Sequence, residues 1–92
     1  MAYTLKIEPR ARRQIRALPR EAQQRITEAL AQLAEQPRPP NAKRLTGHDH
    51  TYRLRLGRYR ILYEVEDRIR VILVIEVGHR REVYERFRRR RR

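Results

Sequence analysis

The sequence predicts one small α+β domain, in which an N-terminal pair of helices packs on one face of a four-stranded, largely antiparallel sheet. Apolar residues recur at helical spacing in the first third of the chain, and strand-like alternation fills much of the rest. A proline-rich segment separates the two regions. The length of 92 residues suits a single domain, and the absence of cysteine excludes disulfides and zinc–thiolate sites. The expected order is β-α-α-β-β-β with a short C-terminal helix.

The N-terminal region predicts a strand followed by two helices. Residues 3–7 alternate between apolar and polar side chains, which is typical of a strand. Pro9 suits the first turn of a helix, and Glu8 places a negative charge near the positive end of the helix dipole. One apolar face of this helix carries Ala11, Ile15 and Leu18, and the helix ends by Pro19.

A second, longer helix is expected from about Arg20 to Glu35. Its apolar face carries Ala22, Ile26, Ala29, Leu30 and Leu33. The two helices therefore form an αα-hairpin. The prolines that follow, Pro37, Pro39 and Pro40, cannot continue a helix, so a loop is expected to run to about Asp49.

Three strands are expected next, over about 51–56, 59–65 and 69–77. Gly57-Arg58 suits a two-residue type II′ turn between the first two, and 66–68 offers a second tight turn. The last strand is apolar on both faces in its middle, which is typical of a central strand covered on both sides. Residues 82–87 suit one or two helical turns. The like-charged run 88–92 is expected to be a disordered basic tail, so the domain is 1–87.

The Gly57-Arg58 turn fixes which residues of the hairpin face each other. One face would carry Tyr52, Leu54, Leu56, Tyr59, Ile61 and Tyr63, and it is apolar enough for the helices to cover. The other face would carry Arg53, Arg55, Arg60, Leu62 and Glu64. Arg55 directly opposite Arg60 would cost about 0.5 kcal/mol unless an anion lies between them. Such a local conflict indicates a functional face; the alternative is a solvated face neutralised by Glu64 and Glu76.

The charge of the chain favours an anionic partner. Lysine and arginine total 24 against 11 acidic residues, for a net charge of +13, and all but Lys6 and Lys43 are arginine. Nucleic acid or an acidic protein segment would suit this surface. The alternative is that the arginine content reflects genome composition or heat adaptation. With no apolar signal region and no candidate membrane span, we expect a cytoplasmic protein without membrane contact.

A second cationic and aromatic cluster follows the last strand. Gly78 would permit a turn that exposes the side chains after it, so Arg80 and Tyr84 could reach the arginine face. Packing of Tyr84 into the core is the alternative. His48-Asp49-His50 offers too few ligands for a metal site, and the sequence shows no nucleophile triad, P-loop or carboxylate pair. An enzyme with this sequence would use cationic and aromatic groups, without metal or cofactor.

The order of these segments resembles the RelE group of the RelE/ParE toxins of toxin–antitoxin modules. The resemblance depends on short motifs in sequence order and covers nearly the whole chain except the arginine tail. The motifs are Met1-Ala2-Tyr3, Leu18-Pro19, Lys43-Arg44-Leu45, Arg53-Leu54-Arg55-Leu56, Tyr59-Arg60-Ile61-Leu62-Tyr63, Val77-Gly78-His79-Arg80 and Glu82-Val83-Tyr84.

The resemblance implies a toxin that cleaves messenger RNA in the ribosomal A site without a metal ion. The 2′-hydroxyl would attack the adjacent phosphate and leave a 2′,3′-cyclic phosphate and a 5′-hydroxyl. Arg53 and Arg55 match two basic positions of the family. Arg60 and Arg80 match arginines that bind the phosphate and offset its developing charge. Tyr84 matches a tyrosine that stacks on a base or orients it.

The chain departs from the family pattern at the proton-accepting position. The best-studied RelE pattern has lysines where this chain has Arg53 and Arg55, and arginine stays protonated. His79 is a candidate for a substitute base. The segment from Gly78 to Tyr84 is also shorter than in some members, which would move Tyr84. Further contacts to RNA or the ribosome are expected from Lys43, Arg44, Arg58 and Arg81.

The resemblance and the charge together imply two partners: messenger RNA on the ribosome, and a cognate antitoxin with an acidic, partly disordered segment. That segment would lie over the arginine face or against the helices. Two alternatives remain for the function. One is a ParE-like toxin that inhibits DNA gyrase without cutting, although Arg60, Arg80 and Tyr84 together favour cleavage. The other is a non-catalytic RNA- or ribosome-binding module.

Overall fold

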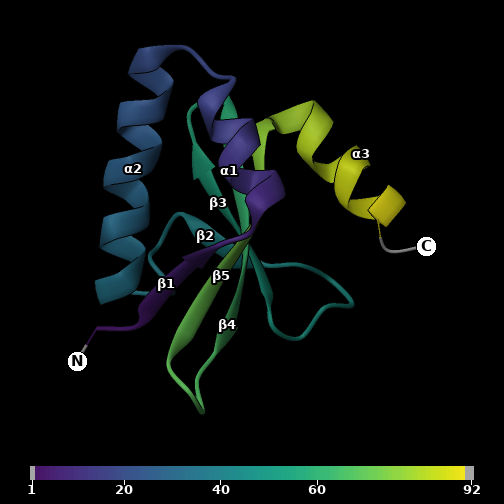
Figure 1. The fold of residues 1–92 in the computed structure, drawn as a ribbon. Coiled ribbons are helices and arrows are strands. Elements are labelled where there is room, and N and C mark those ends of the chain that lie inside the picture. Colours follow the sequence, from purple (N-terminus) through teal and green to yellow (C-terminus); the bar gives the residue numbers. More distant parts are fainter. Residues whose placement is uncertain (1, 91–92) are drawn as a thin grey trace.

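The computed structural model describes residues 2–90, which form five strands and three helices (Figure 1). In chain order these elements are β1 (Thr4–Ile7), α1 (Pro9–Arg16), α2 (Arg20–Glu35), β2 (Ala42–Arg44), β3 (Thr51–Leu56), β4 (Tyr59–Glu66), β5 (Val71–His79) and α3 (Arg80–Arg90). The predicted α+β class is therefore confirmed. No helix within the described range is long and apolar enough to cross a bilayer.

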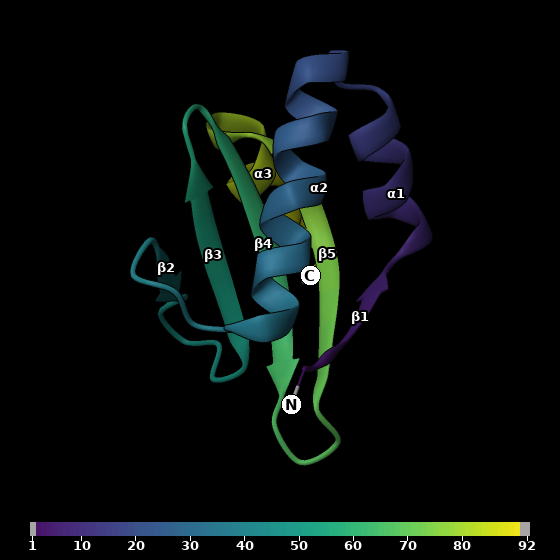
Figure 2. The ribbon, with the colours of Figure 1, turned by 90° about the vertical axis from the view of Figure 1, so that its left-hand side faces the viewer.

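The five strands form one mixed sheet in the order β1-β5-β4-β3-β2. β1 runs parallel to β5, and the other neighbours are antiparallel. Helices α1 and α2 cover one face, while α3 packs against the other (Figure 2). β5 lies between β1 and β4 and is covered on both faces, as its apolar sequence predicts.

The main core lies between the αα-hairpin and the sheet. Ile26, Leu30 and Leu33 of α2 pack there with side chains from β3, β4 and β5, among them Leu54 and Ile61. A smaller cluster on the opposite face joins α3 to the sheet through Leu62, Ile75, Val83 and Phe87. The sheet thus has one face closed by two helices and another that α3 covers only in part.

The β3–β4 hairpin has the predicted register. Tyr52 lies opposite Tyr63, and Arg55 lies opposite Arg60. Gly57 has a φ of 63°, in the left-handed region that favours glycine, as a type II′ turn requires at this position. The Tyr63 hydroxyl donates a 2.6 Å hydrogen bond to the Pro37 carbonyl, so the loop after α2 is fastened to the core.

The predicted count of four strands is wrong, because part of the expected loop is a strand. Ala42–Arg44 pairs antiparallel with β3 and forms an edge of the sheet. A three-residue strand is too short to show alternation in sequence. The last strand also begins later than predicted: Ile69 is 66% exposed and lies in the turn, where Arg70 has a φ of 56°.

The C-terminal helix is longer than expected. It begins directly after β5 and continues through Arg90, so the predicted disordered tail starts inside an ordered helix. Glu82 in its first turn and arginines in its last turn both suit the helix dipole. The side chain of Arg90 also pairs with Glu8 and Glu76, far away in sequence. Arg91 and Arg92 lie outside the described residues.

Candidate functional site

A concavity of about 440 Å³ opens on the sheet face that α3 partly covers. It is lined by Arg53, Arg55, Arg60, Arg80, Arg81 and Tyr84. The structure therefore brings together all five residues for which a catalytic role is expected, with Arg81 as a sixth. β3 supplies two of the arginines, β4 supplies one, and the first turns of α3 supply the remaining three side chains.

The sheet arginines meet because of strand pleating and register. Arg53 and Arg55 are two residues apart on β3, so both project from the same face. Arg60 lies directly opposite Arg55 on β4. This is the like-charge pair expected from the sequence, and it lies in the wall of the concavity. The local electrostatic conflict and the hollow therefore coincide.

Arg60 is held more rigidly than a surface arginine. Its residue is only 7% exposed, and its Nη1 donates hydrogen bonds to the carbonyl oxygens of Gly57 and Tyr59, both at 2.8 Å. These bonds fix the guanidinium against the hairpin turn. A guanidinium carries five N–H donors, so others remain for an anion in the concavity. Arg60 is thus a preorganised cationic donor.

The arginines of the concavity are not neutralised by nearby carboxylates. Within residues 2–90, no acidic side chain lies within ion-pair distance of Arg53, Arg55, Arg80 or Arg81. Glu76, which the sequence offered as a partner for the sheet arginines, pairs with other arginines instead. A concave surface of uncompensated guanidiniums attracts phosphate groups.

Helix α3 brings its side chains to the concavity from the end of β5. The backbone N–H of Arg80 donates to the Arg58 carbonyl at 3.0 Å, which fastens the start of the helix to the hairpin turn. Tyr84 is half-buried: it packs against the small apolar cluster and also lines the concavity. Tyr84 therefore does both things that the sequence suggested as alternatives: it reaches the arginine face and it packs in part against the core. The short segment after Gly78 still delivers the ring to the arginines.

His79 does not join the site. It lies opposite Tyr59 on β4, and the two rings meet edge to face with centroids 6.3 Å apart. Tyr59 and Arg60 are adjacent on the strand, so their side chains point to opposite faces. His79 is therefore on the wrong face to serve as a base in the concavity, and its expected role as a substitute base is not supported by the geometry.

The further RNA contacts expected from the sequence divide into two groups. Arg81 lines the concavity, and Lys43 lines an adjoining hollow of about 200 Å³ that shares Arg53 and Arg55 with it. Arg44 lies opposite Tyr52 in the strand register, so its side chain is on the other face of β2. Arg58 is exposed at the hairpin turn and lines neither hollow.

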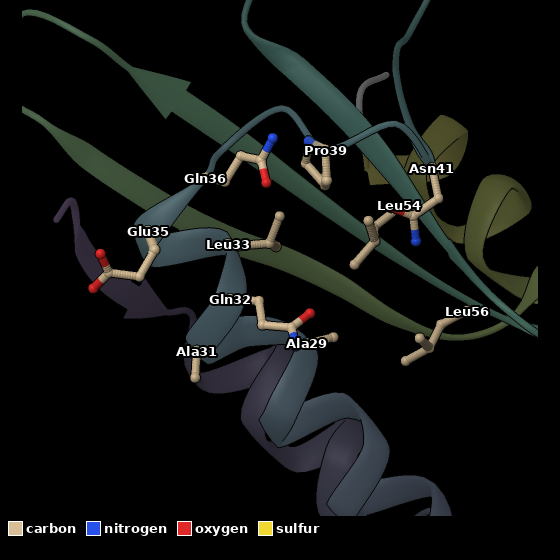
Figure 3. A pocket seen from close by; sticks show the side chains of 10 residues that line it. All are labelled: Ala29, Ala31, Gln32, Leu33, Glu35, Gln36, Pro39, Asn41, Leu54 and Leu56. Carbon is tan, nitrogen blue, oxygen red and sulfur yellow. The ribbon is translucent and has the colours of Figure 1, made fainter.

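A separate hollow lies on the opposite side of the sheet (Figure 3). Its volume is about 390 Å³, and it lies between the C-terminal half of α2 and β3. Leu33, Leu54 and Leu56 contribute to its lining together with the side-chain amides of Gln32, Gln36 and Asn41. No arginine, lysine or histidine of the described residues lines it, so this hollow lacks the cationic groups of the concavity.

Sequence reasoning missed a buried ionic cluster beside the site. Glu76 of β5 has no exposed side-chain surface and contacts Arg10, Arg86 and Arg90. The signal for it was a glutamate within an otherwise apolar strand, between Ile75 and Val77. Such a residue requires charged or hydrogen-bonded partners when it is buried. The sequence alone could not indicate which arginines those partners are.

Comparisons with known proteins show the family of the chain and similar folds. The family described as "ParE toxin of type II toxin-antitoxin system, parDE" matches residues 5–84. The chain is 35% identical over 88 residues to "mRNA interferase toxin RelE" of Escherichia coli K12, covering 91% of this chain and 92% of that protein. It is 31% identical over 90 residues to "Toxin RelG" of Mycobacterium tuberculosis, covering 94% and 100%. The structure of the intact E. coli RelBE toxin–antitoxin complex matches with a TM-score of 0.75 at 32% identity, covering 85% and 96%.

Proposed function

We propose that this chain, which belongs to the ParE toxin family of type II toxin–antitoxin systems, cleaves messenger RNA in the ribosomal A site. The chain is a RelE-like toxin, and a relative that is 35% identical is named an mRNA interferase. The observation that carries the proposal is the concavity formed by five arginines and one tyrosine. That combination suits a phosphate next to a nucleobase.

The chemistry that fits this lining is transfer within the RNA strand. The 2′-hydroxyl oxygen attacks the adjacent phosphorus, and the bond from phosphorus to the 5′-oxygen of the next nucleotide breaks. The products are a 2′,3′-cyclic phosphate and a 5′-hydroxyl, which takes up a proton. Negative charge accumulates on the phosphorane oxygens, where Arg60 and Arg80 would stabilise it. Tyr84 would stack on a neighbouring base.

Charge stabilisation, more than proton abstraction, would supply the rate enhancement. Among residues 2–90, no lysine, histidine or carboxylate belongs to the lining, and guanidiniums stay protonated. Tyr84, the remaining lining side chain of the described residues, is an O–H donor, so the proton of the 2′-hydroxyl would pass to water. The proposal requires no metal ion, because the guanidiniums already supply positive charge beside the reacting phosphate.

The test is primer extension on a messenger RNA incubated with the purified protein, with and without programmed ribosomes. We expect cuts at the A-site codon only when ribosomes are present. Arg60→Ala should lower the cleavage rate by about 10²-fold, the typical effect of removing one preorganised donor to a developing charge. Arg68→Ala is the matched control, because Arg68 is an exposed arginine in the β4–β5 turn, away from the concavity. Wild-type protein that cuts under neither condition would refute the proposal.

Inhibition of DNA gyrase is the second candidate function, since the family that matches residues 5–84 is named for ParE. A supercoiling assay tests it directly. Loss of gyrase activity on addition of the protein, without cleavage of RNA, would favour this candidate. If Arg60→Ala and Arg80→Ala weaken ribosome binding while wild-type protein cuts nothing, the chain is a binding module instead.

The partner that would neutralise the toxin is a cognate antitoxin. Several structural relatives are toxin–antitoxin complexes, including E. coli RelBE. The net charge of +13 and the unpaired site arginines favour an acidic segment in that partner. We expect the toxin to copurify with the antitoxin and the affinity of the pair to fall as salt rises.

A further inference from the structure

Helix α3 supplies half of the residues that line the concavity, so its position determines the geometry of the site. Its apolar attachment to the sheet is small. Val83 and Phe87 are its only buried residues, and they pack against Leu62 and Ile75. Most of the helix surface is polar and solvated. A helix with so little apolar contact requires another attachment to hold Arg80, Arg81 and Tyr84 in place.

That attachment is ionic and involves a buried carboxylate. Glu76 of β5 has a side chain that is 0% exposed. Arg86 Nε lies 3.3 Å from its Oε1, and Arg90 Nη1 lies 3.3 Å from its Oε2. The two arginines are four residues apart, so they lie on one side of α3. Both oxygens of Glu76 are thus engaged by the same helix.

The same two arginines also complete the free edge of β5. Pairing with β1 ends at Val74, so the next backbone groups have no strand neighbour on that side. Arg90 Nη1 donates to the Ile75 carbonyl at 2.9 Å, and Arg86 Nη2 donates to the Val77 carbonyl at 3.2 Å. Buried carbonyls require such partners. Helix α3 is therefore attached to the strand backbone as well as to Glu76.

Helix α1 closes the cluster from the other side. Gln14 Nε2 donates to Glu76 Oε1 at 2.9 Å, and its Oε1 accepts from the Val77 N–H at 2.8 Å. Arg10 Nε lies 3.3 Å from Glu76 Oε2, and Arg90 Nη2 donates to Glu8 Oε1 at 2.8 Å. Removing one partner from such a network leaves a buried charge less well compensated, so the network favours the arrangement of α3 in which Arg86 and Arg90 both reach Glu76.

Gly78 gives independent support for this function of Arg86. Its φ is not in the left-handed region, so no turn requires a glycine there. A Cβ atom at this position would instead collide with Nη2 of Arg86 and lie 3.4 Å from Cγ2 of Val83. The missing side chain therefore leaves the space through which the Arg86 guanidinium reaches β5.

We propose that Glu76 is a positioning residue: through Arg86 and Arg90 it fixes α3 so that Arg80, Arg81 and Tyr84 complete the concavity. This inference depends on the proposed cleavage for its kinetic consequence, and on geometry alone for its structural one. It also gives the arginine-rich end of the chain a function within the fold, since Arg90 belongs to the last turn of α3.

Arg90→Ala and Arg89→Ala form a matched pair that tests the proposal. Both remove one arginine from the same helical turn, which cancels the effect of lost charge. The Arg90 side chain is 26% exposed and bonded to β5, Glu8 and Glu76, whereas Arg89 is 69% exposed and, in the described part of the chain, pairs with Glu85 of its own helix alone. We expect backbone amides of 80–90 to exchange hydrogen about tenfold faster in Arg90→Ala than in Arg89→Ala, with exchange in β3 and β4 unchanged.

The kinetic result should follow the structural one. The single-turnover rate of messenger RNA cleavage on the ribosome should fall about tenfold more in Arg90→Ala than in Arg89→Ala, since a misplaced group loses rate even when it remains present. Glu76→Gln, which removes the charge at nearly constant shape, should show the same exchange pattern. Circular dichroism identifies the temperature range in which each variant is folded, and all rates are compared within it.

Equal exchange and equal rates for the two arginine variants would overturn the proposal. Faster exchange spread evenly over the sheet and the helix would overturn it too, because it would mean a general loss of stability. Absence of cleavage by wild-type protein would refute the proposed function alone. The proposal for Glu76 would then still be tested by the comparison of hydrogen exchange in Arg90→Ala and Arg89→Ala. A second test would compare the affinities of the two variants for a fluorescein-labelled, 2′-O-methylated RNA oligonucleotide, which cannot be cleaved by this route.

Discussion

At the scale of single residues, Arg60 and His79 show how strand alternation assigns chemistry. Arg60 faces the concavity and is fixed by two backbone carbonyls, whereas His79 lies beside Tyr59 on the other face. His79 lies opposite Tyr59, the residue next to Arg60 on β4, and side chains of adjacent strand residues point to opposite faces. The residue with the familiar acid–base chemistry is therefore outside the site, and the permanently charged residue is inside it.

The first prediction concerns His79. His79→Ala should leave the cleavage rate within about twofold of the wild type and leave the shape of the pH–rate profile unchanged, because the ring is on the face opposite the concavity. Single-turnover cleavage between about pH 5.5 and 8.5 measures both quantities across the range where histidine titrates. A lost inflection near neutral pH in the variant would show that His79 takes part in proton transfer.

The second prediction concerns Tyr63, a fully buried residue. Burial, and then the neighbouring Tyr52, raise the pKa of its phenol well above the usual value of 10.0. A raised folded-state pKa means that this contribution to stability is complete below about pH 10 and is lost as pH rises further, when the unfolded phenol ionises.

Tyr63→Phe separates the pH-dependent contribution of the buried phenol from the contribution of its hydrogen bond. At pH 7 the variant should be about 1 kcal/mol less stable, because it loses the hydrogen bond to the Pro37 carbonyl. At pH 11 the difference in unfolding free energy should narrow by about 1 kcal/mol. The reason is that the phenol of Tyr63 ionises in the unfolded wild type and lowers its stability, whereas phenylalanine does not titrate. Urea unfolding at the two pH values measures this difference, and a constant difference would contradict the assignment.

At the scale of elements, the edge strand β2 extends the cationic surface on one side only. Lys43 lies opposite Arg53 and lines the hollow that adjoins the concavity, while Arg44 lies opposite Tyr52 on the helix-covered face. Both residues are exposed and carry one positive charge. Arg44 therefore serves as a control for Lys43, since the two adjacent residues carry equal charge but their side chains point to opposite faces of the sheet.

The third prediction uses this pair. Lys43→Ala should weaken binding of single-stranded RNA about three- to tenfold and make the salt dependence of binding shallower by about 0.7, the contribution of one phosphate contact on a single strand. Arg44→Ala should change both quantities much less. Fluorescence anisotropy with a labelled oligonucleotide at several salt concentrations gives both. Equal effects would mean that RNA senses only net charge at this edge.

At the scale of the whole molecule, five arginines gather on the exposed part of one sheet face, while other arginines lie on the helices and loops. The core joins the αα-hairpin to the other face, and Glu76 uses three arginines to attach helices to β5. Two sets of arginines thus differ in their surroundings: three pair with the buried Glu76, whereas those of the concavity are left uncompensated by any carboxylate of the described residues. Net charge alone does not reveal this division.

The fourth prediction follows from the uncompensated set. The logarithm of the RNA binding constant should fall with the logarithm of salt concentration with a slope of about −3, as for four to five phosphates neutralised on a single strand. Arg68→Ala, in the β4–β5 turn, should leave the slope unchanged, whereas Arg55→Ala should reduce it. A slope near zero for the wild type would show that the concavity does not bind the phosphate backbone.

The sequence by itself determined the α+β class, the family resemblance and the register of the β3–β4 hairpin. These depend on local information: period-two alternation, a Gly57-Arg58 turn and short motifs in order. The same alternation is enough to predict that Arg53, Arg55 and Arg60 share one face of the sheet. The glycine before Arg80 and Tyr84 indicated that both could reach that face, the resemblance implied their roles, and the structure places both beside those arginines.

Only the tertiary structure decided the fifth strand, the length of α3, the exclusion of His79 and the cluster around Glu76. Each depends on residues distant in the chain, such as Glu8 with Arg90 or Arg10 with Glu76. The sequence around an arginine does not show whether it pairs with a buried carboxylate or remains available to bind an anion, because burial and partners are properties of the assembled fold. The sequence therefore predicted the arginines of the concavity, and only the packing of α1, α3 and β5 showed which other arginines pair with Glu76.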